Sequence, residues 1–436
     1  MQTTLSPEFA GTPDGDEAEA ILRRCVHCGF CTATCPTYQL LGDELDGPRG
    51  RIYLIKQVLE GAEPTRATQL HLDRCLTCRN CESTCPSGVD YGHLVEIGRR
   101  AVDAKVPRPA GERATRWLLK EGLTSPLFAP AIAAGQAMRP LVPAKLRGKV
   151  PAAPSPEVAA RGKRWPARTH ARKVLMLAGC VQPALAPNIN AATARVLDAL
   201  GLQAVLPEEA GCCGAIRAHL GDTDGGLADM RRNIDAWWPW VAGLVADGAV
   251  EAIVINASGC GATVKDYSHA LAHDPAYAER AARVSALARD LGEVVLAELA
   301  ALERLVAASR PAVPPGGVRD TVLYHPPCTL QHGQQLRGGV ERVLDAAGFD
   351  VRLPATESHL CCGSAGTYSV LQPALSTALR DRKLAALQAA VPASSGPAPV
   401  AIVSANVGCI GHLQSGTGVP VRHWIEVVDE RLGLGA

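Results

Sequence analysis

The sequence predicts a multidomain α+β and α/β protein, in which a helical N-terminal domain precedes two duplicated α/β cysteine-rich units. Sixteen cysteines in 436 residues form two tight groups near the N-terminus and a looser pattern that occurs twice afterwards. Each looser copy also alternates short apolar stretches with segments of helical periodicity. We therefore expect domains over residues 1–105, 173–318 and 319–436, with a linker over residues 106–172.

The N-terminal cysteines form two motifs of identical spacing, C-x₂-C-x₂-C-x₃-C-P. Three closely spaced thiolates can ligate one iron–sulfur cluster, and in two-cluster ferredoxins the fourth cysteine ligates the other cluster. We therefore predict a helical, ferredoxin-like domain with two [4Fe–4S] clusters. The expected ligands are Cys25, Cys28, Cys31 and Cys85 for the first cluster, and Cys75, Cys78, Cys81 and Cys35 for the second. Two zinc sites are the alternative, but zinc ligands usually come as separated cysteine pairs.

The linker contains ten prolines and no cysteine. We expect short helices near residues 113–119 and 129–138, and extended or irregular chain elsewhere. Between Arg139 and Lys173, ten lysines or arginines accompany a single acidic residue, Glu157. This basic strip is either a solvated linker or a docking strip for an acidic partner or an anionic membrane surface.

The C-terminal cysteines form two copies of one pattern, which indicates an internal duplication. The first copy recurs 148 or 149 residues later, so that Cys180, Cys212, Cys213 and Cys260 become Cys328, Cys361, Cys362 and Cys409. Apolar runs predict strands at 173–178, 203–206, 251–255, 321–324, 350–353 and 400–404, and periodicity predicts helices at 188–200 and 338–347. The cysteines follow the strand ends, where open α/β sheets bind their ligands. We therefore expect one cysteine-lined crevice in each copy.

Each copy could hold a further [4Fe–4S] cluster, a zinc ion or no metal. Its adjacent cysteines could serve two irons of one cluster or act as a redox dithiol. The pattern resembles the CCG domain of heterodisulfide reductase, which ends in C-x₂-C, whereas Ala257 and Asn406 stand at the first position of that pair here. In the second copy His325, His332 or His359 could complete a ligand set or form hydrogen bonds to a cluster. Ordinary loop histidines are the alternative.

Bulk composition excludes some classes of function. The net charge of +1 gives no indication of nucleic-acid binding. The first residues lack both the basic start and the apolar stretch of an export signal, and no run is apolar enough to span a bilayer. We expect a cytoplasmic protein, in which thiols stay reduced and metal ligation is the default role of so many cysteines.

The whole arrangement resembles the iron–sulfur subunits of membrane-associated flavin dehydrogenases, and above all those of glycolate oxidase (glycolate dehydrogenase). The segments that carry this resemblance are CVHCGFCTATCPTYQLLGDELDGPRGRIYLIKQVLEG, HLDRCLTCRNCESTCPSG, RRNIDAWWPW, CTLQHGQ, SHLCCGSAGTY and VRHWIE. The resemblance implies partner subunits that bind FAD and oxidise glycolate to glyoxylate. This chain would then accept electrons, pass them toward a quinone and contribute no catalytic residue. It also implies a peripheral position on the cytoplasmic face of the inner membrane.

Three alternatives share some of these features. Iron–sulfur subunits of anaerobic glycerol-3-phosphate dehydrogenase or of lactate dehydrogenase have the same cysteine architecture. A heterodisulfide-reductase-like enzyme would carry out chemistry at a Cys-Cys-Gly cluster, although Ala257 and Asn406 replace the fifth cysteine. A scaffold stabilised by zinc would transfer no electrons. No G-x-G-x-x-G follows a predicted strand, so we expect FAD only in partner subunits.

Overall fold

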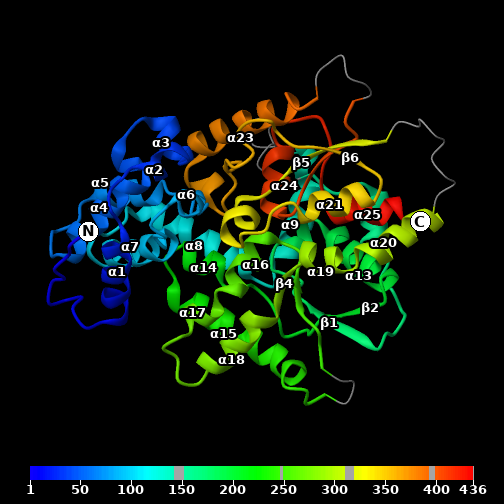
Figure 1. Cartoon of the computed structure of the whole chain (residues 1–436), viewed down its shortest axis with the longest axis horizontal. Coiled ribbons are helices and arrows are strands. Elements are labelled where there is room, and N and C mark those ends of the chain that lie inside the picture. The colour runs from blue at the N-terminus through cyan, green and yellow to red at the C-terminus, as the bar shows by residue number, and fades with distance from the viewer. Residues whose placement is uncertain (142–151, 246–248, 310–318, 392–397, 436) are drawn as a thin grey trace.

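The structure, a computed structural model, has one helical domain and two parallel sheets (Figure 1). It describes residues 1–141, 152–245, 249–309, 319–391 and 398–435. Part of the predicted basic strip, residues 142–151, lies outside the described residues. We use N-terminal domain, first repeat and second repeat for residues 1–105, 173–318 and 319–436, which stay predicted boundaries.

The N-terminal domain is helical. Its helices are α1 (Pro13–Arg24), α2 (Phe30–Ala33), α3 (Pro36–Leu41), η1 (Glu44–Asp46), α4 (Pro48–Leu59), α5 (Arg66–Asp73), α6 (Asn80–Thr84) and α7 (Tyr91–Lys105). Pro36, which follows the last cysteine of the first motif, starts α3, and Pro48 starts α4. At the first position of a helix, the missing N–H of proline costs no helical hydrogen bond. The apolar faces of α1, α4 and α7 meet in one core, which includes Ile21, Ile55 and Leu94. This core supports the loops that carry the cysteines.

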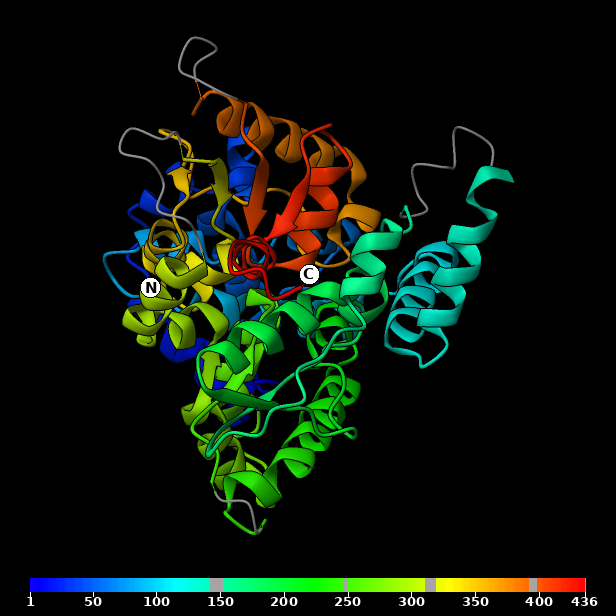
Figure 2. The same ribbon diagram turned by 90° about the vertical axis from the view of Figure 1, so that its right-hand side faces the viewer.

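The linker contains longer helices than the sequence predicts. They are α8 (Ala110–Thr124), α9 (Phe128–Met138), η2 (Arg139–Leu141) and α11 (Pro156–Arg161). Prolines delimit them, because Pro109 precedes α8 and Pro126 lies between α8 and α9. Pro130 lies in the first turn of α9, where proline is tolerated. Neither α8 nor α9 contains a buried residue, and both lie at the edge of the molecule in Figure 2.

The first repeat forms a four-stranded parallel sheet in the order β2-β1-β3-β4. Its strands are β1 (Arg172–Met176), β2 (Leu202–Val205), β3 (Ile253–Ile255) and β4 (Ala288–Asp290). Its helices are α12 (Gln182–Leu185), α13 (Pro187–Ala199), α14 (Ala215–His219), α15 (Thr223–Val241), α16 (Ser258–Lys265), α17 (Tyr267–Ala270), α18 (Ala278–Leu287), α19 (Leu291–Ala297) and α20 (Leu299–Ser309). The expected strands and the helix over 188–200 are present within a few residues.

The second repeat forms a sheet of the same order, β6-β5-β7-β8, which extends the sequence duplication to the topology. Its strands are β5 (Thr321–His325), β6 (Asp350–Arg352), β7 (Ala401–Ser404) and β8 (Val421–His423). Its helices are η3 (Thr329–Gly333), α21 (Gly339–Ala346), α22 (Tyr368–Leu371), α23 (Pro373–Gln388), α24 (Val407–Gln414) and α25 (Trp424–Arg431). The sequence did not predict the fourth strands, β4 and β8, because their residues, Ala-Arg-Asp and Val-Arg-His, form no apolar run.

The two repeats pack against each other reciprocally. Helix α13 of the first repeat packs on α25 of the second, and α21 of the second packs on α19 and α20 of the first. One apolar core joins both sheets, and the buried ion pair between Arg195 and Asp429 (2.7 Å) crosses the same interface. The Ser258 N–H donates to the Ala405 carbonyl (2.9 Å), so the loops that follow β3 and β7 lie side by side. Cys260 and Cys409 lie in the helices that begin at these loops.

Candidate metal centres

The four cysteines predicted for the first cluster line one cavity, called here the first cavity. These four are Cys25, Cys28, Cys31 and Cys85, and Cys81 also reaches the wall of this cavity. Cys25 is buried, Cys28 is exposed, and Cys31 and Cys85 are half-buried. The wall therefore opens to solvent at the loop that carries Cys28, where Val26 and Phe30 are also exposed.

The cysteines predicted for the second cluster line a second cavity. Its thiols come from Cys35, Cys75, Cys78 and Cys81. Three of them are buried and Cys78 is half-buried, so this second cavity is more enclosed than the first. Cys81 and Tyr91 line both cavities, which are therefore neighbours with a shared wall. Each predicted set of four thus converges on one cavity, and its role as a ligand set stays a prediction.

Backbone conformation brings the clustered thiols of each motif to one side. In the first motif His27 and Gly29 have positive φ angles (58° and 86°), and in the second Thr77 and Arg79 do (49° and 58°). Residues with side chains rarely adopt this region, and β-branched residues do so least. Such conformations persist at functional sites where surrounding structure holds them. In each motif, two residues with left-handed backbone conformation therefore bend the loop around its cavity.

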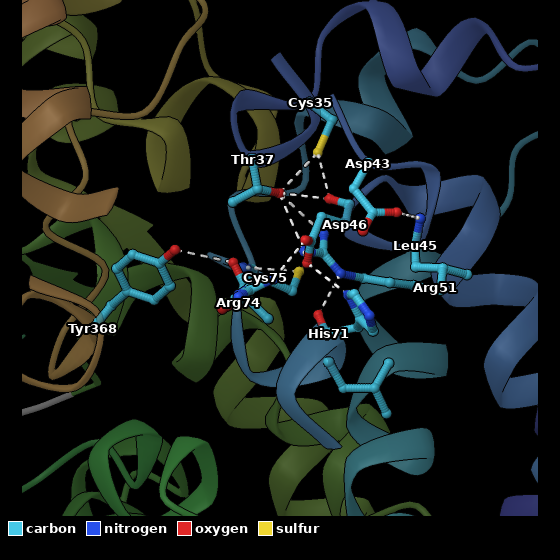
Figure 3. A network of polar contacts seen from close by, with 12 residues as sticks. Cys35, Thr37, Asp43, Leu45, Asp46, Arg51, His71, Arg74, Cys75 and Tyr368 are labelled. Carbon is cyan, nitrogen blue, oxygen red and sulfur yellow. Dashed lines mark hydrogen bonds and ion pairs between the residues drawn. The ribbon is translucent and has the colours of Figure 1, made fainter. Parts of the chain in front are cut away.

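A buried network of charges supports the second cavity (Figure 3). The Arg51 guanidinium, whose side chain is 1% exposed, donates to the Thr37 hydroxyl (3.2 Å) and the His71 carbonyl (2.7 Å). It also pairs with Asp46 (3.4 Å), and Asp46 in turn accepts from Arg74 (2.8 Å). Two arginines around one buried carboxylate leave an excess of positive charge beside the thiols. No motif in the sequence marks Arg51, since it lies within an otherwise ordinary amphipathic helix.

The same environment favours the thiolate, the form that ligates metals, at Cys75, whereas burial raises the pKa of Cys78 and Cys81. Burial alone would raise the pKa of Cys75, but the guanidinium groups of Arg51 and Arg99 hold it below its ordinary value. Donors also point at the sulfur, from the Thr77 N–H (3.4 Å) and the Tyr91 hydroxyl (3.6 Å). In the first cavity, burial and the neighbouring Cys25 raise the pKa of Cys31 to about 11. Crowded thiols of this kind release their protons when a metal centre binds, so both cavities fit such a group.

In the first repeat, Cys180, Cys212, Cys213 and Cys260 come together at the strand ends. Hydrogen bonds from Cys180 and Cys213 lower the pKa of Cys212 to about 3, while the same contact raises the pKa of Cys180. The Gly214 N–H, at the start of α14, also favours the Cys212 thiolate. The four thiols of this repeat therefore lie close together, and the Cys212 sulfur accepts hydrogen bonds from its neighbours, while the cysteine-lined crevice stays a prediction.

In the second repeat all four cysteines are buried. The sulfurs of Cys328 and Cys361 lie 3.7 Å apart. The sulfurs of Cys362 and Cys409 and a ring nitrogen of His325 all lie within 4.8 Å of one another. Of the three histidines considered from the sequence, the structure brings His325 to the thiols.

The other two of these three histidines, His332 and His359, lie at the contact of the second repeat with the N-terminal domain. A ring nitrogen of His332 lies 2.9 Å from the Ser83 hydroxyl, and the other lies 3.0 Å from the His359 carbonyl. The Asn80 side-chain amide donates to that same carbonyl (3.4 Å). These histidines therefore help to fix the second repeat on the helix that carries Cys81.

An apolar group, called here the bridging cluster, joins the second cavity to the second repeat. It consists of the buried residues Leu76, Cys328, Cys361, Tyr368 and Leu379, with Cys78 at its edge. The Tyr368 hydroxyl donates to the Arg74 carbonyl (3.0 Å; Figure 3). Cys78 of the second cavity and Cys328 and Cys361 of the second repeat thus pack in the same apolar cluster.

Comparisons with known protein families match three separate segments of the chain. Residues 21–89 match the family described as a 4Fe-4S dicluster domain. Residues 174–265 and 322–414 match the family described as a cysteine-rich domain. The helical N-terminal fold and the two α/β cysteine-rich units predicted from the sequence are therefore confirmed.

Curated relatives resemble the whole chain. The glycolate oxidase iron-sulfur subunit of Escherichia coli (strain K12) is 51% identical over 437 residues, which cover 99% of each chain. The probable glycolate oxidase iron-sulfur subunit of Bacillus subtilis (strain 168) is 31% identical, over 92% of this chain and 90% of that protein. Lactate utilization protein A of Geobacillus thermodenitrificans is 27% identical over 59% of this chain and 99% of that protein. The predicted resemblance is thus confirmed, and the chain belongs to the family of glycolate oxidase iron–sulfur subunits.

Proposed function

We propose that this chain accepts electrons from FAD-binding subunits that oxidise glycolate to glyoxylate, and passes them toward a quinone. The observation that carries the proposal is the continuous row of thiol sites. The first cavity shares a wall with the second cavity, and the bridging cluster joins the second cavity to the second repeat. Family membership with the glycolate oxidase relatives supports the choice of substrate.

The proposed cofactors are two [4Fe–4S] clusters. Cys25, Cys28, Cys31 and Cys85 would hold one, and Cys75, Cys78, Cys81 and Cys35 would hold the other. When bound, such clusters exchange single electrons, whereas a reduced flavin carries two. The protein supplies the thiolates and the buried arginines that compensate their charge, and the bridging cluster keeps water away from Cys78.

The exposed side of the first cavity is the proposed docking place for the FAD-binding subunits. Val26 and Phe30 are 68% and 61% exposed beside Cys28, and Tyr53 is 45% exposed near the His27 ring. Large apolar side chains gathered at one surface often mark a protein interface. A partner that covers them would approach the thiols of this cavity directly.

The linker is the proposed site of peripheral contact with the cytoplasmic face of the inner membrane. No helix among the described residues is long and apolar enough to span a bilayer. Helices α8 and α9 and the turn between them instead expose large apolar side chains close in sequence to the basic strip, namely Trp117, Leu118, Leu127 and Met138. Apolar side chains beside basic residues favour adsorption to anionic lipid.

The alternatives are weaker. The lactate utilization relatives match only 59% of this chain, at 24% identity in one case and 27% in another. An anaerobic glycerol-3-phosphate dehydrogenase subunit would share the cysteine spacing but has no particular observation in its favour. A heterodisulfide-reductase-like activity would lack a fifth cysteine, because Ala257 and Asn406 occupy the helix N-caps that precede Cys260 and Cys409.

The test is Cys78→Ser in the complete complex, purified anaerobically, with Thr84→Ser at the end of the helix that follows Cys78 as the control. We expect the iron content to fall by about half from roughly eight per chain. Flavin reduction by glycolate should persist, while quinone reduction stops. Quinone turnover at the rate of the unmodified complex would contradict the proposed electron route, and turnover with lactate in place of glycolate would contradict the proposed substrate.

A further inference from the structure

His325 is a buried histidine whose imidazole nitrogens form no hydrogen bond with the described residues. Its side chain is 0% exposed, and neither ring nitrogen has a hydrogen-bond partner among the described residues. Its backbone is held firmly, because it ends β5 and its carbonyl accepts from the Ser404 hydroxyl (3.0 Å). Burying an unpaired polar group is costly, and natural proteins rarely do so without a function. The ring is therefore expected to contact something in the native site.

The nearest candidate partners are two thiols. The sulfurs of Cys362 and Cys409 and a nitrogen of His325 lie within 4.8 Å of one another, and all three residues are buried. Imidazole and thiolate together suit zinc and similar divalent metals. We propose that the second repeat holds a single zinc-class ion through His325, Cys362 and Cys409, with an adjacent thiolate of the same repeat as the fourth ligand.

The spacing of these ligands favours a single ion over a cluster. Zinc binds thiolates at about 2.3 Å and imidazole at about 2.0 Å, so tetrahedral ligand atoms lie roughly 3.5–4 Å apart. The ligand atoms of His325, Cys362 and Cys409 all lie within 4.8 Å of one another, so small side-chain movements would bring them to that spacing. Across the described ranges, none of the thiols of the first and second cavities belongs to such a compact group. Those thiols surround cavities, whereas Cys362 and Cys409 of the second repeat converge with His325.

The local charge also agrees with this ligand set. Three thiolates and one neutral imidazole leave a zinc ion with a net charge of −1. The buried ammonium of Lys383 interacts with the thiols of Cys361 and Cys362, and it donates to the Glu357 and Ser358 carbonyls. A buried cation beside a buried anionic site lowers the cost of keeping both away from water.

The first repeat lacks the equivalent residues. The duplication places Leu177 opposite His325 and Ile234 opposite Lys383. Both replacements are buried and apolar. The inference therefore applies to the second repeat alone, and it does not depend on the proposed electron transfer.

The experiment measures zinc and iron by mass spectrometry in the full-length chain, purified anaerobically and dialysed against EDTA. We expect about one zinc per chain, and in His325→Leu a loss of zinc affinity of at least about tenfold. Leucine is the residue that the first repeat carries here, so the variant should remain folded. Iron should stay near eight per chain, which separates this result from a failure of the two cavities. His359→Ala is the control for a histidine of the same repeat outside the site.

A second measurement uses Co²⁺ as the probe in place of zinc. His325→Cys should still bind Co²⁺, with a stronger sulfur-to-cobalt charge-transfer absorption than the unmodified chain. The proposal would be wrong if the unmodified chain held no zinc and roughly twelve irons, since the second repeat would then hold a cluster. It would also be wrong if His325→Leu kept its zinc, or if the cobalt spectrum were the same with histidine and cysteine.

Discussion

The two repeats contact the N-terminal domain through different chemistry. The first repeat uses charged side chains, because His93 lies between Glu17 (3.4 Å) and Asp266 (3.2 Å), and His269 contacts the same Glu17 (2.7 Å). The second repeat uses neutral hydrogen bonds and the bridging cluster. The difference indicates that only the second contact is built to keep water out, and it lies beside thiols on both sides.

The two cavities also differ in how far their thiols and neighbouring arginines are shielded from solvent. The first has an exposed thiol, Cys28, and its nearby Arg49 is a partly exposed partner of Glu44 (2.6 Å). The second is lined mainly by buried thiols and is braced by Arg51, which is almost completely buried. We expect substitutions on the second side to affect folding and metal retention, and those on the first side to affect association.

The largest effect is expected from Arg51→Leu. This change leaves Asp46 buried with fewer partners and removes positive charge from Cys75. Breaking a buried ion pair costs about 3–5 kcal/mol. Arg49→Leu, the matched change at the first cavity, should cost about 1 kcal/mol or less because its pair is exposed. Anaerobic denaturation would measure both, and equal losses would contradict the contrast between the cavities.

The next effect is expected from Leu379→Ala in the bridging cluster. Leu379 is 1% exposed, and truncation of a buried leucine costs about 2–5 kcal/mol. Val370→Ala is the control, since Val370 is 54% exposed in the neighbouring α22. The variant should also lose iron to a chelator faster than the control does. If the rate of iron loss did not change, the bridging cluster would not shield the second cavity.

The smallest effect is expected from pH, at the charged contact of the first repeat. Burial alone would lower the pKa of His93, but hydrogen bonds to Asp266 and Glu17 raise it to about 10. The stabilisation from His93 is therefore complete below its unfolded pKa of 6.5, and is lost as the pH rises toward about 10. Hydrogen bonds from His269 and His93 lower the pKa of Glu17, so its contribution is present above pH 4.5 and is lost in acid.

The measurement is the free energy of unfolding between pH 6.5 and pH 9.5, for the unmodified chain and for His93→Gln. One proton changes this free energy by at most about 1.4 kcal/mol per pH unit. The unmodified chain should lose stability across this range relative to the variant. Parallel curves would show that the contact does not depend on the protonation of His93.

Much of the fold could be predicted from the sequence, because cysteine spacing and apolar runs are local signals. The crossed sets of cysteines around each cavity and the six strands that apolar runs predict are of this kind. The strand Val421–His423 contains one apolar residue followed by two polar ones and gives no such signal, and α8 extends beyond the predicted residues because prolines delimit it without entering it. Arg51 could not be recognised and His325 could not be distinguished from His332 and His359, since their surroundings depend on burial against residues distant in the sequence.

The crossing of the two motifs has a consequence for maturation. Cys35 lies with the second motif and Cys85 with the first, so any centre that forms in either cavity ties both motifs together. Binding of the first metal centre would therefore account for nearly all of the entropy lost in closing the chain between the motifs. The second centre would then bind to thiols that are already close together. Assembly of this domain should thus be cooperative, with few half-loaded molecules, and neither motif should be able to mature as a separate unit.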